Sequence, residues 1–332
     1  MTVAPSTPRV SVIVPTRNRP ALLEEALQSL ADQTFRDWEA VVVDDGSEPA
    51  VDGDALALRF GARVRLQRHE AGLGGASAKN TGSRAARAAI LAFLDDDDLF
   101  APQYLARAIE ALDRHPDLDG IFMKVGWFGA RQAVAEADSD RAMRRALELA
   151  QGHERAPGLL VFDHRLFAAL LQTVPMTFQR IVVRRSVFEK IGGYEPHCLL
   201  WDCDWAIRAS ATGRFGLVLD ALYRQRAQGQ GTSSRPERRL EHMRSRAEIN
   251  DRLHVEGARY GLDRGQCRAA RDSAAAAWFS VAYFHCTERH AVGEALRAWI
   301  ASQRRLPSLR RCTFLVRLVR GGLVGRRFRR MA

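Results

Sequence analysis

The sequence predicts an α/β fold, a doubly wound and mostly parallel sheet flanked by helices. In the first 100 residues, short apolar runs alternate with helical patterns. This alternation indicates a parallel sheet. The runs are continuously apolar, which is typical of strands that are covered on both faces. From about residue 235 onward only helical patterns remain, so we also predict an α-helical C-terminal extension.

Four strands are predicted in the first half of the chain, at residues 9–15, in the apolar part of 38–47 before its acidic residues and Gly46, and at 62–67 and 90–94. The first, RVSVIVP, is rich in β-branched residues and ends at a proline. It is followed by ALLEEALQSLADQ, whose apolar residues recur at helical spacing. A glycine-rich loop and a small-residue helix at 76–89 separate the third strand from the fourth. The order of these elements supports parallel strands joined by crossovers.

The second half is less regular, and its patterns are mostly helical. DSDRAMRRALELAQ and FDHRLFAALLQ, between about residues 128 and 177, predict helices, and TVPMTF returns the chain toward the sheet. IGGYEP predicts a turn at 191–196, and WDCDWAIRAS predicts a helix after it. Beyond residue 235, small and aromatic residues at helical spacing predict helices that pack on one another.

The composition is that of a globular protein with a sizeable core. The 332 residues are 46% hydrophobic and 27% charged. The five cysteines are odd in number and include no C-x-x-C pair, which favours a reducing cytosol over a disulfide framework. No apolar segment reaches the roughly 18–20 residues of a spanning helix, and MTVAPSTPRV lacks the apolar stretch of a secretory signal. We therefore expect a protein that does not cross a membrane.

The net charge of +11 is concentrated in the C-terminal tail. SQRRLPSLRRCTFLVRLVRGGLVGRRFRRMA has only arginines among its charged residues. The interleaving of apolar residues with arginines is typical of a helix that lies on anionic lipid. A basic helix packed on the protein body is the alternative. Nucleic acid is not the expected partner, because the predicted binding edge of the sheet is acidic and would repel phosphates.

Polar clusters follow three of the predicted strands. PTRN occupies 15–18, DDGS occupies 44–47 and DDDD occupies 95–98. Ligands of such sheets bind beyond the carboxyl ends of the strands, so these clusters are expected to converge. Carboxylates gathered at one edge favour a divalent cation such as Mg²⁺ or Mn²⁺, held with the help of substrate phosphate oxygens. The alternative is that the aspartates cap a helix that begins near Pro102.

The spaced motifs together resemble one enzyme family. VSVIVPTRNRPALLEEALQSLADQTFRDWEAVVVDDGS resembles the opening of the family 2 glycosyltransferases, which are inverting enzymes of the GT-A fold. AFLDDDDLFAPQYL resembles their D-x-D metal motif, and a looser similarity extends to about residue 226. The resemblance implies a GT-A-like domain at 1–234, with a nucleotide-binding half at about 1–100 and an acceptor half at 101–234. The basic helical extension would occupy 235–332.

For the first half, the resemblance implies a nucleotide-sugar site and a metal site. Asp95 and Asp97 match the D-x-D carboxylates, with Asp97 as the direct metal ligand, Asp96 as the variable middle residue and Asp98 as a cap or supporting group. The residues implied to bind the nucleotide sugar are Pro15, Thr16, Asn18, Asp44, Asp45, Lys79, Asn80, Asp95 and Asp96. For Asn18 a turn role, and for Lys79 a solvated surface charge, are the alternatives.

For the second half, the resemblance implies a catalytic base in WDCDW. Asp202 matches the base of the family and Asp204 matches a later acidic position, and both stay candidates. Trp201 stands where the family pattern has Glu. The family often has a metal- or diphosphate-binding His within 222–234, and none is present there. Arg224 is the predicted replacement for this His, and Arg226 is an equal candidate. The alternative is that both are surface residues of a strand.

The implied function is an inverting, metal-assisted glycosyltransferase that moves a sugar from a nucleotide-diphosphate sugar to an acceptor hydroxyl. Its cofactor would be Mn²⁺ or Mg²⁺, and its acceptor a saccharide or a lipid-linked molecule. Surface polysaccharide or glycoconjugate synthesis at the inner face of the cell membrane is the expected setting, and the location is cytoplasmic. The alternative is a catalytically inactive module that binds a sugar nucleotide.

Overall fold

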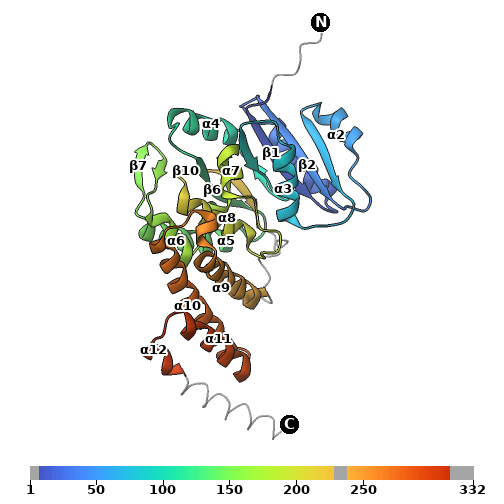
Figure 1. Cartoon of the computed structure of the whole chain (residues 1–332). Helices are drawn as coiled ribbons and strands as arrows, with labels where there is room; N and C mark the ends of the chain where they lie inside the picture. Colours follow the sequence, from blue (N-terminus) through green and yellow to red (C-terminus); the bar gives the residue numbers. More distant parts are fainter. Residues whose placement is uncertain (1–6, 228–237, 315–332) are drawn as a thin grey trace. The chain divides into compact units, whose positions relative to one another are not determined.

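The computed structural model describes residues 7–227 and 238–314, which form two compact units (Figure 1). The first unit contains residues 7–197 and 201–227, and the second contains 198–200 and 238–314. The first unit is an α/β sheet domain and the second is entirely helical in its regular structure. The predicted α/β fold with helices toward the C-terminus is confirmed.

The described residues of the first unit build one ten-stranded sheet with the order β3-β2-β1-β4-β9-β6-β10-β8-β7, and β5 pairs with β10. Its strands are β1 (Val10–Thr16), β2 (Trp38–Asp45), β3 (Val64–His69), β4 (Ile90–Phe93), β5 (Leu99–Phe100), β6 (Gly120–Phe128), β7 (His153–Ala156), β8 (Leu159–Val161), β9 (Ile181–Arg184) and β10 (Phe215–Arg226). Strands β5, β8 and β9 run against the direction shared by the others. The sheet is therefore mixed but mostly parallel.

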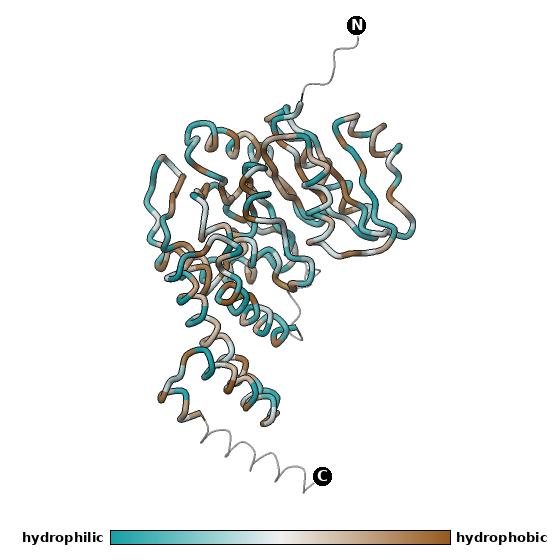
Figure 2. The backbone as a smooth tube through the Cα atoms, viewed as in Figure 1, coloured by the Kyte–Doolittle hydropathy of each residue, from teal (hydrophilic) through white to brown (hydrophobic). Residues whose placement is uncertain are grey.

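Helices cover both faces of the sheet (Figure 1). They are α1 (Pro20–Ala31), α2 (Gly53–Phe60), α3 (Gly75–Ala85), α4 (Tyr104–Arg114), α5 (Gln132–Ala150), α6 (Arg165–Gln172), α7 (Arg185–Ile191) and α8 (Trp201–Thr212), with a 3₁₀ turn at Met176–Gln179. Val10, Val12 and Val14 of β1 share one core with α1 and α4. Ile13, on the opposite face, meets α3 at Gly82. This double coverage explains why the strands are apolar without alternation, and the apolar stretches are visible in Figure 2.

The helix predicted at 76–89 ends earlier, at Ala85, because the backbone N–H groups that follow donate hydrogen bonds to side chains of β1 and β2. Arg87 donates its N–H to Glu39 Oε1 at 2.7 Å, and Ala88 donates its N–H to Ser11 Oγ at 3.0 Å. Ser11 also donates to Glu39 at 2.7 Å, so the three segments share one buried network. Periodicity within the helix could not reveal this competition, since Ser11 and Glu39 are distant in sequence.

At Gly82, α3 lies close against the sheet, and we predict that Gly82→Ala destabilises the protein. A Cβ there would lie 2.4 Å from Ile13 Cγ2 and 3.1 Å from Val43 Cγ2. Overpacking costs about 1–3 kcal/mol, while the gain in helix propensity is about 1 kcal/mol or less. We expect a net loss of about 1–2 kcal/mol in the free energy of unfolding, measured by urea denaturation. Gly293→Ala, at a helical glycine whose Cβ would meet no atom within 4 Å, is the matched control and should not destabilise.

The second unit consists of α9 (Arg239–Val255), a 3₁₀ turn (Gly257–Tyr260), α10 (Arg264–Thr287), α11 (Val292–Arg305) and α12 (Leu309–Cys312). Helix α10 begins with a capping box, in which Asp263 accepts the N–H of Gln266 at 2.8 Å and Gln266 Oε1 accepts the N–H of Asp263 at 2.9 Å. A small core that includes Val281, Ala298 and Phe314 holds the helices together. The arginine-rich segment beyond residue 314 lies outside the described residues. Within the described residues, no helix has the length and apolar character required to span a membrane.

Candidate functional site

The four aspartates at 95–98 follow β4 directly and form a tight turn. Leu94 donates its N–H to Ile13 O at 3.0 Å, and Asp98 donates its N–H to Asp95 O at 3.0 Å. Strand β5 follows, and α4 begins only at Tyr104, with Gln103 as its N-cap and no side-chain capping bond. The aspartates therefore do not cap this helix, and the capping interpretation is wrong.

Two buried cations hold Asp95. Lys79 Nζ lies 2.6 Å from its Oδ1, and Arg180 Nη1 lies 3.2 Å from its Oδ2. Burial alone would raise the pKa of Asp95, but the charges of Lys79 and Arg180 outweigh it and hold the pKa at about 2. The repulsion within the acidic run is thus partly balanced by the protein itself. Lys79 is buried, so its interpretation as a solvated surface charge is wrong.

Asp98 is buried and faces the protein interior. It accepts the hydroxyl of Tyr223 at 2.9 Å and the backbone N–H of Arg226 at 2.9 Å, and Arg180 Nη2 lies 3.6 Å away. Burial raises the pKa of Asp98 to about 7, against the opposing charge of Arg180. Its contacts join the acidic turn to β10, so Asp98 has the supporting role that we expected.

Asp96 and Asp97 share a third cation, Arg19, which lies just before α1. Arg19 Nη1 is 3.2 Å from Asp96 Oδ1 and 3.0 Å from Asp97 Oδ2. Thr16 donates its hydroxyl to Asp96 Oδ2 at 2.8 Å. Burial raises the pKa of Asp96 to about 6, and burial with the neighbouring Asp95 charge raises the pKa of Asp97. The side chain of Asp97 is 20% exposed and that of Asp96 only 7%.

The carboxylates of this turn fit a divalent cation whose remaining ligands come from a substrate. Among the described residues, no group of three or more His, Cys, Asp or Glu side chains is arranged to hold a metal ion. One or two carboxylates with phosphate oxygens are the usual protein environment of Mg²⁺. The side chains of Asp95 and Asp97 are 27% and 20% exposed, and Asp97 fits this role better because its partner is the partly exposed Arg19. Both oxygens of Asp95 already face buried cations.

Asp44 belongs to the turn that follows β2. It accepts the N–H groups of Ser47 at 2.8 Å and Val51 at 3.1 Å, and it forms an ion pair with Arg68. Its side chain is completely buried. Because no oxygen of Asp44 is exposed to a ligand, we correct its assignment from nucleotide contact to turn formation.

Asp45 holds the glycine-rich loop of 72–75 in place. It accepts the N–H groups of Leu73 and Gly74, each at 2.8 Å, and His69 Nδ1 lies 2.7 Å from its Oδ1. Burial would raise the pKa of Asp45, but these hydrogen bonds lower it overall. Gly46, with φ +74°, allows close contact, because a Cβ there would lie 2.7 Å from the backbone of Ala71 and Gly72.

The side chain of Asn80 links α3 to the turn that follows α7. Its side chain donates to Tyr194 O at 2.7 Å and accepts the N–H of Tyr194 at 2.9 Å. A Cβ at Gly193 would lie 2.4 Å from Asn80 Oδ1, so only glycine permits this approach. Both ends of the amide are bound to protein, and we therefore correct the nucleotide-contacting role predicted for Asn80 to a positioning role.

Trp201, the first residue of α8, connects the acidic turn with the predicted base. Lys79 Nζ lies 4.7 Å from the centre of its ring, and the ring meets Tyr194 edge-on with centroids 4.8 Å apart. A cation over an aromatic face is stabilised by the ring quadrupole. Trp201 thus fixes Lys79, which in turn pairs with Asp95.

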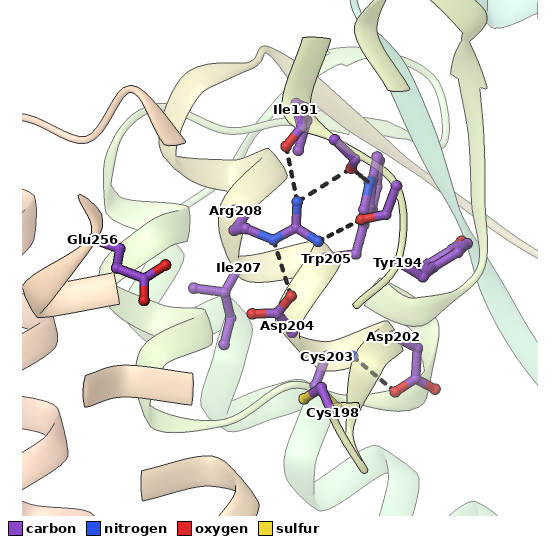
Figure 3. A network of polar contacts seen from close by, with 12 residues as sticks. Ile191, Tyr194, Cys198, Asp202, Cys203, Asp204, Trp205, Ile207, Arg208 and Glu256 are labelled. Atoms are coloured by element: carbon purple, nitrogen blue, oxygen red, sulfur yellow. Dashed lines mark hydrogen bonds and ion pairs between the residues drawn. The ribbon is translucent and has the colours of Figure 1, made fainter. Parts of the chain in front are cut away.

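Asp202 and Asp204 have different environments, as Figure 3 shows. Asp204 is completely buried and accepts Arg208 Nε at 2.9 Å. Arg208 donates further to the carbonyls of Ile191 at 2.8 Å and Gly193 at 2.8 Å. Asp202 is half-buried and accepts the backbone N–H of Cys203 at 2.8 Å. Asp204 is thus held in a buried ion pair, and Asp202 is the more accessible of the two candidate bases.

The remaining predicted residues lie around the ends of β1 and β10. Pro15 and Thr16 are at the end of β1. Asn18, with φ +55°, accepts the N–H of Glu48 at 2.8 Å and links two turns. Arg224 is exposed. Arg226, instead, donates its Nε to Asp97 O at 2.9 Å, so of these two arginines it is Arg226 that contacts the acidic turn.

Three residues of this cluster were missed by sequence reasoning: Arg19, Arg180 and Tyr223. Arg19 follows PTRN by one residue, and its closeness to that cluster was a usable signal. Arg180 precedes a short strand and Tyr223 lies within a long one. Nothing local marks either of them, because their partners are about 80 or more residues away along the chain.

The sheet and the polar edge define an α/β protein whose carboxylates and cations gather beyond the carboxyl ends of its strands, where the ligands of such sheets bind. Residues 11–192, more than half of the chain, match the family model described as glycosyl transferase family 2. The chain belongs to this family. It is 33% identical over 113 residues to an uncharacterized glycosyltransferase of Haemophilus influenzae, covering 34% of this chain and 37% of that protein. It is 40% identical over 107 residues to a validoxylamine A glucosyltransferase of Streptomyces hygroscopicus, covering 31% and 25%. The matches thus span between a quarter and little more than a third of these relatives' length.

Solved structures show the same fold. The structure of S. aureus TarS 1–349 in complex with UDP-GlcNAc has a TM-score of 0.55 at 19% identity, covering 90% of this chain and 91% of that chain. The mannosyltransferase PcManGT of Pyrobaculum calidifontis, in complex with GDP-Man and Mn²⁺, has a TM-score of 0.54 at 21% identity, covering 95% and 81%. The GT-A-type fold predicted from the sequence is confirmed by these glycosyltransferase neighbours.

Proposed function

We propose that the first unit is a metal-assisted, inverting glycosyltransferase that moves a sugar from a nucleotide-diphosphate sugar to an acceptor hydroxyl. The observation that carries the proposal is the acidic turn at 95–98, which combines the partly exposed Asp97 with three cations at one edge of the sheet. Membership in glycosyl transferase family 2 supports the reaction class. The nucleotide sugars and Mn²⁺ in the neighbouring structures support the donor class and the cofactor.

In this proposal the diphosphate of the donor lies against the acidic turn and its cations. Asp97, with Asp95, would hold the Mn²⁺ or Mg²⁺, which when bound stabilises the negative charge that develops on the leaving diphosphate. Lys79 and Arg180 keep Asp95 ionised and fixed. Asp98 anchors the turn to β10 through Tyr223. The protein thus presents a preorganised turn, which is the condition for electrostatic catalysis.

Asp202 is the proposed base. It takes the proton of the acceptor hydroxyl while that oxygen attacks C1 of the sugar from the face opposite the diphosphate. The bond between C1 and the phosphate oxygen breaks, the nucleoside diphosphate leaves with the bonding pair, and the anomeric configuration inverts. Trp201, next to Asp202, provides an aromatic face against which a sugar can stack.

The nucleotide pocket is proposed to lie at the ends of β1 and β2. Pro15 and Thr16 line it, and Asp45 shapes its glycine-rich wall through Leu73 and Gly74. Asp96, which accepts the hydroxyl of Thr16, would form the part of the pocket next to the acidic turn. Arg226, which contacts the acidic turn, takes the place that the sequence suggested for Arg224.

We propose the same wider setting that the sequence predicts. Residues 1–234 would form the glycosyltransferase domain and 235–332 a basic extension. The acceptor would be a saccharide or a lipid-linked molecule in surface polysaccharide or glycoconjugate synthesis. The proposed location is the cytoplasm, with peripheral binding to the anionic inner face of the cell membrane through the tail.

A thermal-shift screen tests the donor and the cation together. We expect one nucleotide sugar, among UDP- and GDP-sugars, to raise the apparent Tm with Mn²⁺ present, because ligand binding stabilises the folded state. At a hundredfold excess over Kd the gain is about 2.7 kcal/mol. Asp97→Asn should lose the Mn²⁺-dependent part of this shift. Asp138→Asn, at an exposed aspartate of α5, is the control and should retain it.

An inactive sugar-nucleotide-binding module is the second candidate, favoured by Trp201 in place of the expected glutamate. It predicts a full Mn²⁺-dependent shift without turnover of any donor, either by transfer or by hydrolysis. The absence of any shift with every nucleotide and nucleotide sugar would contradict both candidates.

A further inference from the structure

The acidic turn has two kinds of cation. Lys79 and Arg180 are buried, with 3% and 6% of their side chains exposed, and both belong to the packed interior. Arg19 is 39% exposed and reaches the turn from the start of α1. Its guanidinium contacts Asp96 at 3.2 Å and Asp97 at 3.0 Å. Arg19 is therefore the cation that can move without unpacking the core.

Asp95 and Asp98 are held by buried groups. The two oxygens of Asp95 face Lys79 and Arg180. Asp98 is bound by Tyr223 and by the backbone of β10. Asp97 differs because its side-chain partner is the exposed Arg19. A divalent cation that reaches the turn must therefore compete with Arg19 for Asp97 Oδ2.

The exchange of Arg19 needs no unpacking of the core and has a destination. Asp96 and Asp97 are largely buried, so the release of Arg19 is offset only when the divalent cation replaces its charge beside them. A guanidinium binds phosphate oxygens in a planar, bidentate manner. A nucleoside diphosphate that binds beside Asp97 would present such oxygens to the released side chain.

We propose that Arg19 neutralises Asp97 in the free protein and moves to the donor diphosphate when a divalent cation takes its place. This inference rests on the proposed function and adds a residue that contacts the diphosphate. It also makes binding of the cation and the nucleotide cooperative, because the two events share one arginine. The free protein should accordingly bind the cation weakly.

Mn²⁺ titration followed by electron paramagnetic resonance tests the proposal, with the full chain alone and with UDP or GDP. Arg19→Met should bind Mn²⁺ alone about tenfold more tightly than the unmodified protein, because the competing charge is gone. The gain in Mn²⁺ affinity on addition of the nucleoside diphosphate should be smaller in the variant by a similar factor. Arg19→Lys keeps the charge and should restore weak binding of Mn²⁺ alone.

Arg9→Met is the matched control, since Arg9 precedes β1 at its opposite end and pairs with an exposed aspartate, Asp113. It should leave both Mn²⁺ affinities unchanged. The Tm of each variant establishes that the fold is intact. Unchanged Mn²⁺ affinity in Arg19→Met overturns the proposal, and so does a tighter site with an undiminished gain. If neither UDP nor GDP binds the unmodified protein, the proposed function fails, and the titration with Mn²⁺ alone still decides whether Arg19 competes with the cation.

Discussion

Asp202→Asn is expected to lower kcat by about 10²–10⁴-fold, the usual contribution of a general base. Asparagine keeps the size of the side chain and its hydrogen bond from Cys203 but cannot take the acceptor proton. Donor binding should be unchanged, because Asp202 is proposed to act on the acceptor and not on the diphosphate. The measurement is steady-state transfer with the donor found by thermal shift, together with the Mn²⁺-dependent Tm shift of the variant.

Asp204→Asn separates the chemical role from the structural one. Its buried ion pair with Arg208 predicts a loss of stability, with activity falling only as far as folding does. Transfer per folded molecule, measured well below the Tm, should therefore stay within a few-fold of the unmodified protein. If Asp202→Asn retained full kcat while Asp204→Asn lost it, the assignment of the base would be reversed.

The sequence predicted the sheet and the position of the polar edge because both depend on local patterns. Strands ended where apolar runs met PTRN, DDGS and DDDD, and parallel strands bring such ends together. The resemblance then assigned roles to these clusters. Asp97 and Asp202 keep their proposed roles because each is partly exposed.

Asp44, Asn80 and Asp204 were assigned to ligands or catalysis, yet each is engaged by the protein. A motif identifies the type of side chain at a site but not where its lone pairs point. That depends on contacts such as Asn80 with Tyr194, which are 114 positions apart. The same limitation hid Arg180, whose charge decides the pKa of Asp95 together with Lys79.

The site therefore consists of a few partly exposed residues, among them Asp97 and Asp202, whose positions are fixed by a larger number of buried residues. Trp201 and Asn80 both tie α3 to the segment around α8, through Lys79 and Tyr194 respectively. Arg208 ties the turn at 191–193 to α8. These contacts hold α8, the helix that carries Asp202. The position of the proposed base therefore depends on residues that are not proposed to touch the substrate.

Arg208→Met is expected to be the most destabilising change outside the acidic turn. It removes the guanidinium that pairs with the buried Asp204, and the bonds to the carbonyls of Ile191 and Gly193. Removing one partner of a buried ion pair costs about 3–5 kcal/mol. Urea denaturation should show this loss in the free energy of unfolding, and the Tm should fall by roughly ten degrees.

A double replacement distinguishes the loss of the ion pair between Asp204 and Arg208 from the loss of packing by the Arg208 side chain. Asp204→Leu combined with Arg208→Met removes both charges, so it should be less destabilising than the sum of the two single changes. Arg141→Met is the control on the surface of α5, where Arg141 lies 3.4 Å from Asp138 and the side chains are 74% and 67% exposed. It should change stability by less than about 1 kcal/mol. Additive losses in the double variant would mean that Arg208 stabilises α8 through the 191–193 carbonyls alone, and that the charge of Asp204 contributes nothing.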